Sequence, residues 1–354
     1  MLLRERGRAG VHFELSPELI ADGPVEADGV SRRDDARLLV ARGRGALVDT
    51  TFARVGDHLD AGDVLVVNNS ATLPAAVPTE VGLVLHLSTE LPGGLWVVEL
   101  RRPSGAGTRP YRDGEAGRVF ALPAGGAATL LAPFPAGADT TDGVRLWVAE
   151  LTTPGALEAW LAEVGRPIRY GDTVTSWPLS AYQTAFAREP GSAEMPSAAR
   201  AFTPELVARL VARGVVIVPI TLHTGVSSQD ADEPPYEERF RVPATTATVV
   251  NASRRAGGRV VAVGTTATRA LETATDSGGT VHPAHGWTSH IVTPEAGVRA
   301  VDGIISGWHE PEASHLRLLE AVIGSDVLAR AYDAALQLRY RWHEFGDLFL
   351  ATRT

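Results

Sequence analysis

Residues 262–273 read AVGTTATRALET, a short apolar run joined to a helical pattern through one glycine and two threonines. The apolar run predicts a strand buried on both faces, and Gly264 would let a ligand approach the backbone where that strand ends. Thr265 and Thr266 would place hydroxyl groups beside the free N–H groups of a helix N-terminus. We expect this junction to bind an anionic group such as a carboxylate; ordinary helix capping is the alternative.

Two charged side chains follow in the same helical pattern. Arg269 and Glu272 lie three positions apart, so they share one face of the expected helix. They are expected to form an ion pair with each other or to bind a ligand together, and a simple surface ion pair is the alternative.

The order of strand, polar loop and helix recurs on both sides of this segment. Runs that predict strands occupy residues 64–67 (VLVV), 215–222 (VVIVPITL) and 301–306 (VDGIIS). Polar loops follow them, with Asn69 and His223 in the first two. Because repeated units of this kind build parallel sheets whose carboxyl ends share one edge, we expect an α/β fold with a mainly parallel sheet or barrel and its site at that edge.

A different pattern interrupts these units. Between residues 78 and 153 the expected strands are short and alternate with Pro- and Gly-rich turns such as PSGAGTRP at residues 103–110. This pattern is typical of all-β structure. We therefore predict two domains: an α/β catalytic domain formed by residues 1–77 and 154–354, and a small inserted β domain formed by residues 78–153.

Composition narrows the classes of function. The chain has 354 residues, 44% of them apolar and 21% charged, which is typical of a soluble globular protein. It has no apolar run long enough to span a membrane and no apolar leader, so we expect it to act in the cytoplasm. It lacks cysteine, and all 33 basic residues are arginine, which excludes thiolate metal sites, a cysteine nucleophile and Schiff-base chemistry. The net charge of −9 argues against a surface that is basic throughout but leaves room for a local arginine-lined groove.

Two histidines lie in loops that follow expected strands. His223, in TLHTG at residues 221–225, could act as an acid or base near neutral pH or be a structural histidine. His309 lies in GWHEP at residues 307–311, where Trp308 offers a flat surface for stacking or packs within the turn.

The motif YRWHEFGD, residues 340–347, concentrates polar side chains near the C-terminus. Arg341 and Asp347 are candidates for substrate contact, and a solvated helix end is the alternative.

The histidines of HPAH, residues 282–285, and the nearby His290 are the remaining candidates for metal ligands. They have no partnered carboxylate at ligand spacing, so we expect no metal site.

Taken together, the motifs occur in the order and spacing of a known family. The chain resembles the S-adenosylmethionine:tRNA ribosyltransferase-isomerase family of queuosine biosynthesis over nearly its whole length, through FELSPELIADGP, GDVLVVNNSATLPA, YQTAFA, TLHTG, AVGTTATRALET, GWHEPEAS and YRWHEFGD. The most specific are AVGTT-x-x-R-x-LE and YR-x-x-x-x-GD. The resemblance implies a barrel-like, mainly parallel α/β domain interrupted by a small β-barrel domain, which corresponds to the insert at residues 78–153.

The resemblance implies a reaction with two substrates. The ribosyl moiety of S-adenosylmethionine would be transferred to an aminomethyl-deazaguanine base in the anticodon region of tRNA and isomerised to give epoxyqueuosine, while adenine and methionine leave. S-adenosylmethionine would be a co-substrate, and no metal or redox cofactor is implied.

The resemblance also selects residues for each role. His223 and His309 would move protons, with Glu238 orienting or acting as the base. The residues expected to bind S-adenosylmethionine are Gly264, Thr265, Thr266, Arg269 and Glu272. The expected contacts to the acceptor are Asn69, Tyr182, Gln183, Trp308, Arg341 and Asp347.

The chain departs from the family pattern in two segments. Ala71 and Ala76 stand where the family's NNTRVIPAR has arginines, and GSAEMPSAARAFT at residues 191–203 stands for GSVAAPTAGLHFT. Two alternatives therefore stay open: an S-adenosylmethionine-consuming enzyme with a small-molecule acceptor, and a non-catalytic binding relative. Nothing in the sequence indicates an oligomeric state. If tRNA is the acceptor, the arginines expected to meet its phosphates are Arg200, Arg239, Arg241 and Arg341.

Overall fold

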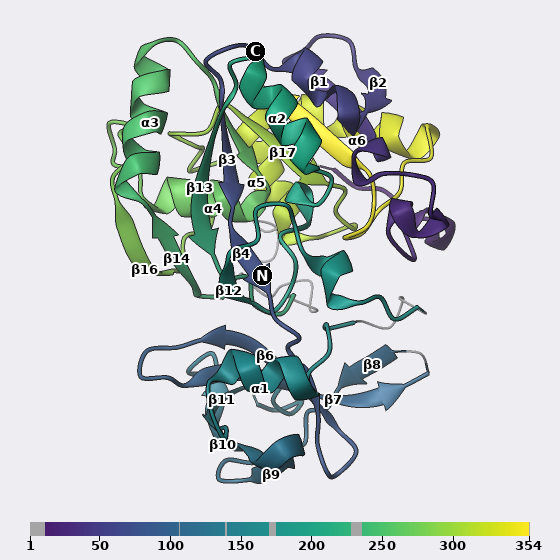
Figure 1. Ribbon diagram of the computed structural model, residues 1–354, viewed down its shortest axis with the longest axis vertical. Helices are drawn as coiled ribbons and strands as arrows, with labels where there is room; N and C mark the ends of the chain where they lie inside the picture. The colour runs from purple at the N-terminus through teal and green to yellow at the C-terminus, as the bar shows by residue number, and fades with distance from the viewer. Residues whose placement is uncertain (1–10, 106, 139, 170–174, 228–235, 354) are drawn as a thin grey trace.

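The structure, a computed structural model, describes residues 11–105, 107–138, 140–169, 175–227 and 236–353. Two sheets of different size lie one above the other in Figure 1, and most of the helices accompany the larger, upper sheet. Between them lies a two-stranded ladder formed by β4 (Ser70–Thr72) and β12 (Glu189–Ser192).

Four adjacent parallel strands form the centre of the larger, nine-stranded sheet. In sheet order they are β13 (Val216–Leu222), β3 (Val64–Asn68), β15 (Val260–Val263) and β17 (Gly303–Gly307). β3 and β15 are buried at every position, which explains their continuous apolar runs. Alternate residues enter separate cores, so that Val64 and Val66 belong to one core and Leu65 and Val67 to another.

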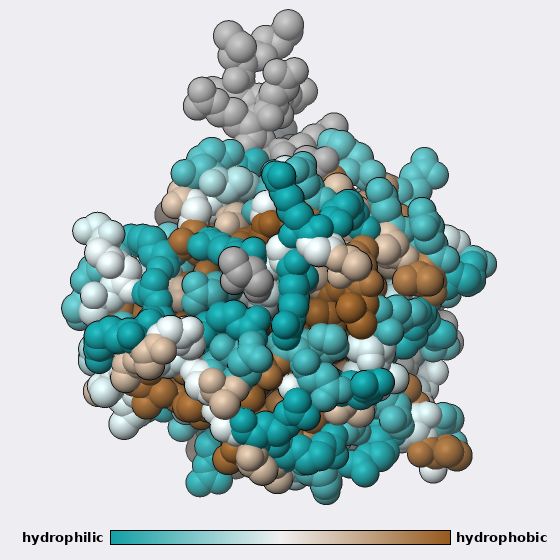
Figure 2. Space-filling model, turned by 90° about the horizontal axis from the view of Figure 1, so that it is seen from above, coloured by the Kyte–Doolittle hydropathy of each residue, from teal (hydrophilic) through white to brown (hydrophobic). Residues whose placement is uncertain are grey.

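Helices cover both faces of this sheet. One face is covered by α3 (Ala244–Arg255), α4 (Thr265–Thr273), α5 (Ser314–Ile323) and α6 (Ser325–Gln337). The other is covered by α2 (Pro204–Ala212) and the 3-10 helix Phe52–His58. None of the helices within the described ranges is long and apolar enough to cross a membrane. Seen from the upper end, hydrophilic residues cover most of the surface and apolar residues form separate patches (Figure 2).

The flanking strands make the larger sheet mixed. The added strands are β14 (Glu238–Val242) and β16 (Ala284–Thr288) on one side, and β18 (Leu348–Thr352), β1 (Arg37–Arg42) and β2 (Val48–Thr51) on the other. Four of the pairings are parallel and four antiparallel, so the expectation of a barrel-like, mainly parallel sheet is not confirmed. One reason is that two helices, α5 and α6, separate β17 from β18. The second helix returns the chain to the end where β17 finishes, and β18 therefore runs antiparallel to it.

The smaller sheet is formed by strands between residues 76 and 152. In the part of the chain that the structure describes, none of these strands pairs with the larger sheet. The two edges of the smaller sheet lie close to each other. The backbone N–H of Glu80, near one edge, donates to the carbonyl oxygen of Ala121, near the other, at 3.2 Å. Helix α1 (Leu157–Val164), which lies beyond the expected boundary at residue 153, packs in the core of this sheet through Trp160. The strands are β5 (Ala76–Pro78), β6 (Val84–Glu90), β7 (Trp96–Ser104), β8 (Gly107–Pro110), β9 (Val119–Leu122), β10 (Gly126–Phe134) and β11 (Leu146–Thr152).

A buried ion pair joins the amino ends of two central strands, β3 and β15. Asp63, immediately before β3, is 2% exposed and binds the guanidinium of Arg259, immediately before β15, at 2.5 Å. Its carboxylate also accepts the backbone N–H groups of Asp60 and Arg259. Burial alone would raise the pKa of Asp63, but the hydrogen bonds from Arg259 and Asp60 hold that pKa below its ordinary value.

We expect Asp63→Ala to lower the free energy of unfolding by about 3 kcal/mol at neutral pH, because it removes the buried one of the two carboxylates that bind the Arg259 guanidinium; the other, Asp60, is exposed. Since the folded-state pKa is lowered, this stabilisation is present above the unfolded value of 3.8 and is lost as the pH falls through the folded value. Urea unfolding at neutral and acid pH measures it. Asp57→Ala, which breaks half-exposed ion pairs, is the control; equal effects of the two variants at neutral pH would contradict the account.

Candidate active site

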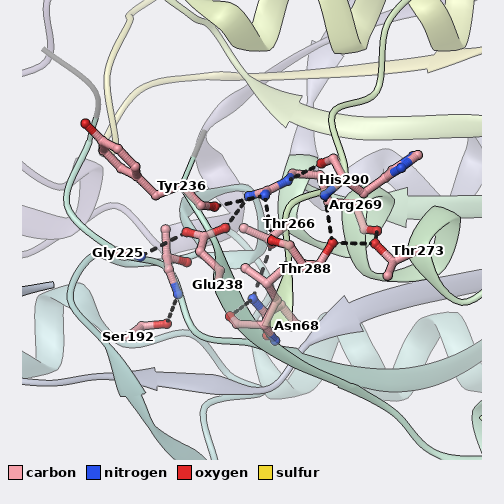
Figure 3. A network of polar contacts seen from close by, with 12 residues as sticks. Asn68, Ser192, Gly225, Tyr236, Glu238, Thr266, Arg269, Thr273, Thr288 and His290 are labelled. Carbon is pink, nitrogen blue, oxygen red and sulfur yellow. Dashed lines mark hydrogen bonds and ion pairs between the residues drawn. The ribbon is translucent and has the colours of Figure 1, made fainter. Parts of the chain in front are cut away.

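The carboxyl ends of the four central strands bring together motifs that are far apart in the sequence. In sheet order these ends carry His223, Asn68, Gly264 and His309. This is the edge at which the sequence analysis placed the site, and it is where α/β sheets bind their ligands. Figure 3 shows the polar contacts around it.

Asn68 is completely buried and connects three of these chain segments (Figure 3). Its side-chain nitrogen donates to the carbonyl oxygen of Leu222 at 2.8 Å and to the hydroxyl of Thr266 at 3.2 Å. Its side-chain oxygen accepts the N–H groups of Leu222 and Ser70, each at 3.0 Å. The amide therefore holds the end of β13 and the start of α4 at fixed positions.

Helix α4 begins at the end of β15 through a conformation that favours glycine. Gly264 has a φ of +91°, and its N–H donates to the carbonyl oxygen of Ile305 at 2.7 Å. A Cβ at this position would lie 3.4 Å from the Cβ of Ala198. Thr265, the first helical residue, is half-buried. Because no side chain among the described residues caps this helix end, its first N–H groups suit an anionic ligand group.

Arg269 and Glu238 form a buried ion pair in the middle of the network in Figure 3. Arg269 is 7% exposed and Glu238 is 8% exposed. One carboxylate oxygen of Glu238 accepts from the guanidinium, and the other accepts the backbone N–H of Gly225 at 2.9 Å. The guanidinium also donates to three carbonyl oxygens, those of His290 at 3.1 Å, Tyr236 at 3.3 Å and Thr288 at 3.4 Å. The ion pair therefore fastens α4 to β14 and to the loop that follows β13.

The expected ion pair between Arg269 and Glu272 is not formed. Glu272 is 1% exposed and accepts the backbone N–H groups of Arg299 and Ala300, both at 2.9 Å. The reason is that Arg269 turns toward Glu238 on a neighbouring strand, whereas Glu272 faces the backbone before β17. Glu272 thus holds a loop against α4, and Arg269 holds Glu238.

His223 follows β13 and belongs to a chain of side-chain hydrogen bonds. Its Nδ1 lies 2.8 Å from the hydroxyl of Ser70, which lies 2.6 Å from the hydroxyl of Ser192. Burial, followed by the positive charges of Arg239 and Arg241, lowers the pKa of His223 to about 4. The ring is therefore neutral at neutral pH and able to accept a proton.

A pair of stacked histidines lies beyond β17. The rings of His309 and His315 stack with their centroids 4.6 Å apart, and Nε2 of His309 lies 2.9 Å from the hydroxyl of Ser306. Desolvation by the surrounding protein, followed by the charge of Arg269, lowers the pKa of His315 to about 4, while part of the residue stays exposed. Burial and the neighbouring His315 hold the pKa of His309 well below its ordinary value. Both rings are neutral at neutral pH, and the charge of Arg269 acts on His315.

Trp308 does not offer the expected stacking surface. It is 3% exposed, its ring stacks on that of Phe349 at 5.1 Å, and it meets the rings of Tyr332 and Tyr340 at steep angles. The reason is that α6 and the C-terminal segment bring aromatic side chains into one core, which the indole completes.

Gln183 and Asp347, two more of the expected acceptor contacts, bind backbone. The amide of Gln183 accepts the N–H of Thr72 at 3.0 Å and donates to its carbonyl oxygen at 2.7 Å. Asp347 accepts the N–H groups of Arg37 at 2.8 Å and Arg341 at 2.7 Å. Both residues therefore fix the chain around the site.

Asn69 and Arg341 are expected acceptor contacts that reach solvent, and their side chains, unlike that of Gln183, do not bind the backbone of any described residue. Asn69 is half-buried, and its side-chain oxygen accepts from the hydroxyl of Thr221 at 2.7 Å. The side chain of Arg341 is 53% exposed and lies 3.6 Å from Asp22. Tyr182, by contrast, is 2% exposed.

Each of the four arginines expected to meet tRNA phosphates has an acidic neighbour. The pairs are Arg200–Glu26 at 2.5 Å, Arg239–Glu90 at 2.9 Å, Arg241–Glu189 at 3.5 Å and Arg341–Asp22 at 3.6 Å. Arg200 is 5% exposed, so the expectation that it lines a surface groove is wrong. The other three are partly exposed, and exposed pairs are weak enough to exchange an acidic partner for a phosphate.

Four further residues, absent from the sequence-based expectations, lie in the site: Asn68, Ser70, Ser192 and His315. Asn68 and Ser70 flank Asn69, so the polar strand end that selects Asn69 could also have indicated them. Ser192 and His315 reach the site only through tertiary contacts with Ser70 and His309.

The described ranges contain no group of three histidine, aspartate or glutamate side chains that could hold a metal ion. His282, from the HPAH motif, lies 2.8 Å from a carboxylate oxygen of Asp276.

We expect the ring C–H signals of His223 to titrate near pH 4 in NMR spectra of the folded protein. The double variant Arg239→Ala, Arg241→Ala should raise this pKa, because two positive charges that disfavour the protonated ring are removed. Arg255→Ala, at an exposed position of α3, is the control and should change nothing. A titration at the ordinary value of 6.5, or no response to the double variant, would contradict this environment.

Comparison with known proteins agrees with the arrangement of the motifs. Residues 9–351 match the family described as Queuosine biosynthesis protein. The chain is 35% identical to the S-adenosylmethionine:tRNA ribosyltransferase-isomerase of Symbiobacterium thermophilum, over 96% of this chain and 97% of that protein. It is 34% identical to the protein of the same name from Synechococcus elongatus, over 96% and 94% of the two chains.

A solved structure extends the similarity to the fold. The S-adenosylmethionine tRNA ribosyltransferase of Thermotoga maritima superposes with a TM-score of 0.53 and 26% identity, over 96% of this chain and 99% of that one. Sequence and fold therefore agree along nearly the whole chain, and the chain belongs to the queuosine biosynthesis protein family.

Proposed function

We propose that this chain is an S-adenosylmethionine:tRNA ribosyltransferase-isomerase. It transfers the ribosyl moiety of S-adenosylmethionine to an aminomethyl-deazaguanine base in the anticodon region of tRNA, gives epoxyqueuosine, and releases adenine and methionine. The observation that carries the proposal is the family match over residues 9–351, which includes every strand end of the site. The reaction takes place in the cytoplasm, with S-adenosylmethionine as co-substrate and no metal or redox cofactor.

The reaction needs a base, because it begins with removal of a proton from the ribose carbon bonded to the sulfonium. His223 and His309 are the candidates, since burial lowers the pKa of each ring and leaves it neutral at neutral pH. His223 is also buried, which limits water beside its ring. Glu238 has the orienting role, because Arg269 and the backbone of Gly225 already bind its two oxygens.

The N-terminal end of α4 is assigned to the methionine or ribose part of S-adenosylmethionine. Its first N–H groups and the hydroxyls of Thr265 and Thr266 match a carboxylate or a ribose hydroxyl. Gly264 has no side chain, so the ligand can approach the backbone at this point. Arg269 and Glu272 are proposed to hold this helix in place and not to touch the ligand, because both charges already have protein partners.

Asn69 and Arg341 are proposed as direct contacts to the acceptor, because both reach solvent. The proposed supporting residues are Tyr182, Gln183, Trp308 and Asp347, which are buried or bind backbone. The smaller sheet and α1, residues 76–164, are proposed to form an inserted domain beside an α/β catalytic domain.

A small-molecule acceptor is the second candidate. It is favoured by the acidic partners of the four arginines and by Ala71 and Ala76, which carry no charge for a phosphate. An enzyme of this kind would still release adenine.

Thr266→Val should weaken S-adenosylmethionine binding about fivefold, because it removes a hydroxyl at the start of α4 without changing its shape. Gly264→Val should weaken it further, since valine is strained at a φ of +91°. Isothermal calorimetry measures both affinities. Thr273→Val, at the other end of the same helix, is the matched control, and unchanged affinity in both test variants would move the binding site elsewhere.

Incubation with S-adenosylmethionine and tRNA that carries the deazaguanine precursor should release adenine. His223→Asn should slow the release about 100-fold or more, because it removes a candidate base. Glu163→Gln, an exposed change on α1, is the control. Release that requires a small amine rather than tRNA would favour the second candidate, and no release on any acceptor would favour a non-catalytic relative.

A further inference from the structure

Backbone hydrogen bonds to neighbouring segments hold the loop that follows His223. The N–H of Thr224 donates to the hydroxyl of Ser192 at 3.0 Å. The N–H of Gly225 donates to a carboxylate oxygen of Glu238 at 2.9 Å (Figure 3). Two successive N–H groups of the loop therefore bind side chains from two different strands, β12 and β14.

The next N–H group of the loop binds the smaller sheet. The N–H of Val226 donates to the hydroxyl oxygen of Ser88, on β6, at 3.0 Å. Ser88 is 3% exposed, Val226 is 5% exposed, and the valine side chain lies in the core of the smaller sheet. Arg145, immediately before β11, adds a second contact, because its guanidinium donates to the carbonyl oxygen of Ser227 at 3.5 Å. Buried groups of the smaller sheet thus anchor the loop that carries His223.

Gly225 allows this loop to lie close to β6. A Cβ at this position would lie 2.8 Å from the hydroxyl oxygen of Ser88. A carbon atom at that distance overlaps the oxygen, so an alanine here would force the hydroxyl to rotate away from Val226 or the loop to move. The backbone of Gly225 does not have a positive φ, so this contact, and not the backbone conformation, excludes a side chain.

The end of β6 also contacts the strands beside the loop. The carboxylate of Glu90 lies 2.9 Å from the guanidinium of Arg239, on β14. The indole N–H of Trp287, on β16, donates to the carbonyl oxygen of Glu90 at 2.9 Å. Ser88 therefore belongs to a continuous contact between β6 and the edge of the larger sheet that carries the site.

We propose that Ser88 is a positioning residue for the reaction: its hydroxyl holds residues 223–226 so that the ring of His223 and the carboxylate of Glu238 keep their places. The inference rests on the proposed function, in which His223 is a candidate base. Ser88 acts through the backbone of Val226. A base must lie within hydrogen-bond reach of the proton that it removes, so a displacement of about 1 Å slows the reaction and leaves S-adenosylmethionine bound at α4.

Ser88→Ala should lower kcat for adenine release about tenfold, because the N–H of Val226 loses its acceptor. The assay uses saturating S-adenosylmethionine and tRNA that carries the deazaguanine precursor. The Kd for S-adenosylmethionine, measured by calorimetry, should change less than about twofold, since the start of α4 is unaltered. Ser104→Ala, at an exposed position of the same sheet, is the matched control. An unchanged kcat, or an equal loss of kcat and affinity, would overturn the inference.

A double variant tests the contact between Gly225 and Ser88. Gly225→Ala alone should lower kcat at least about tenfold, because the added methyl group meets the hydroxyl of Ser88. In the Ser88→Ala background the same change should add less than about a twofold loss, since the atom that it meets is absent. Effects of the two changes that multiply in the double variant would contradict the proposal. Ser88→Ala adds no atom, so it gives a result even where Gly225→Ala does not fold.

NMR titration of His223 gives a readout that does not depend on turnover. The charged groups that act on the ring, and their acidic partners, lie on three strands: Arg239 and Arg241 on β14, Glu90 on β6 and Glu189 on β12. Ser88→Ala changes none of these charges. A loop that is no longer held admits water to the ring, so the pKa of His223 should rise from about 4 toward 6.5 in Ser88→Ala and stay unchanged in Ser104→Ala.

An unaltered His223 titration in Ser88→Ala would overturn the positioning role. If the unaltered protein still releases adenine in that case, the proposed function stands without this inference. If the unaltered protein releases no adenine on any acceptor, the proposed function fails, and the titration still decides whether Ser88 holds the ring.

Discussion

The structure of the site depends on the buried ion pair between Arg269 and Glu238. Two buried charges are stable only when their remaining hydrogen-bonding groups also have partners. Three carbonyl oxygens, from β16 and two loops, and the N–H of Gly225 supply these partners. The result is that β14, α4 and the loop after β13 cannot move independently. A site built from four strand ends thereby acquires one fixed geometry.

Around this fixed centre lie three histidines whose rings are neutral at neutral pH. Desolvation lowers the pKa values of His223, His309 and His315, and nearby arginines add to the effect at His223 and His315. Neutral rings suit removal of a proton next to a sulfonium, and the N-terminal end of α4 beside them suits the anionic end of the same molecule.

The location of the site could be predicted from the sequence, because a strand followed by a glycine or a polar residue is a local pattern. Four such patterns end at the carboxyl edge of the larger sheet. Local patterns also led to the errors. They offered Glu272, three positions away, as the partner of Arg269, whereas the structure uses Glu238, 31 positions away on another strand. They offered the ring of Trp308 as a stacking surface for a ligand, although aromatic residues of α6 and the C-terminal segment bury it. The direction of a strand depends on the whole segment that connects it to the strand before it, such as α5 and α6 between β17 and β18. A short sequence pattern does not contain this information.

The central claim is that S-adenosylmethionine binds at the strand ends held by the Arg269–Glu238 ion pair. Amide hydrogen exchange with and without S-adenosylmethionine tests it most directly. We expect slower exchange in residues 264–268 and 222–225, where the ligand would cover the start of α4 and the loop bound to Glu238. Protection confined to other parts of the fold, such as the turn between α5 and α6 at Gly324, would contradict the account.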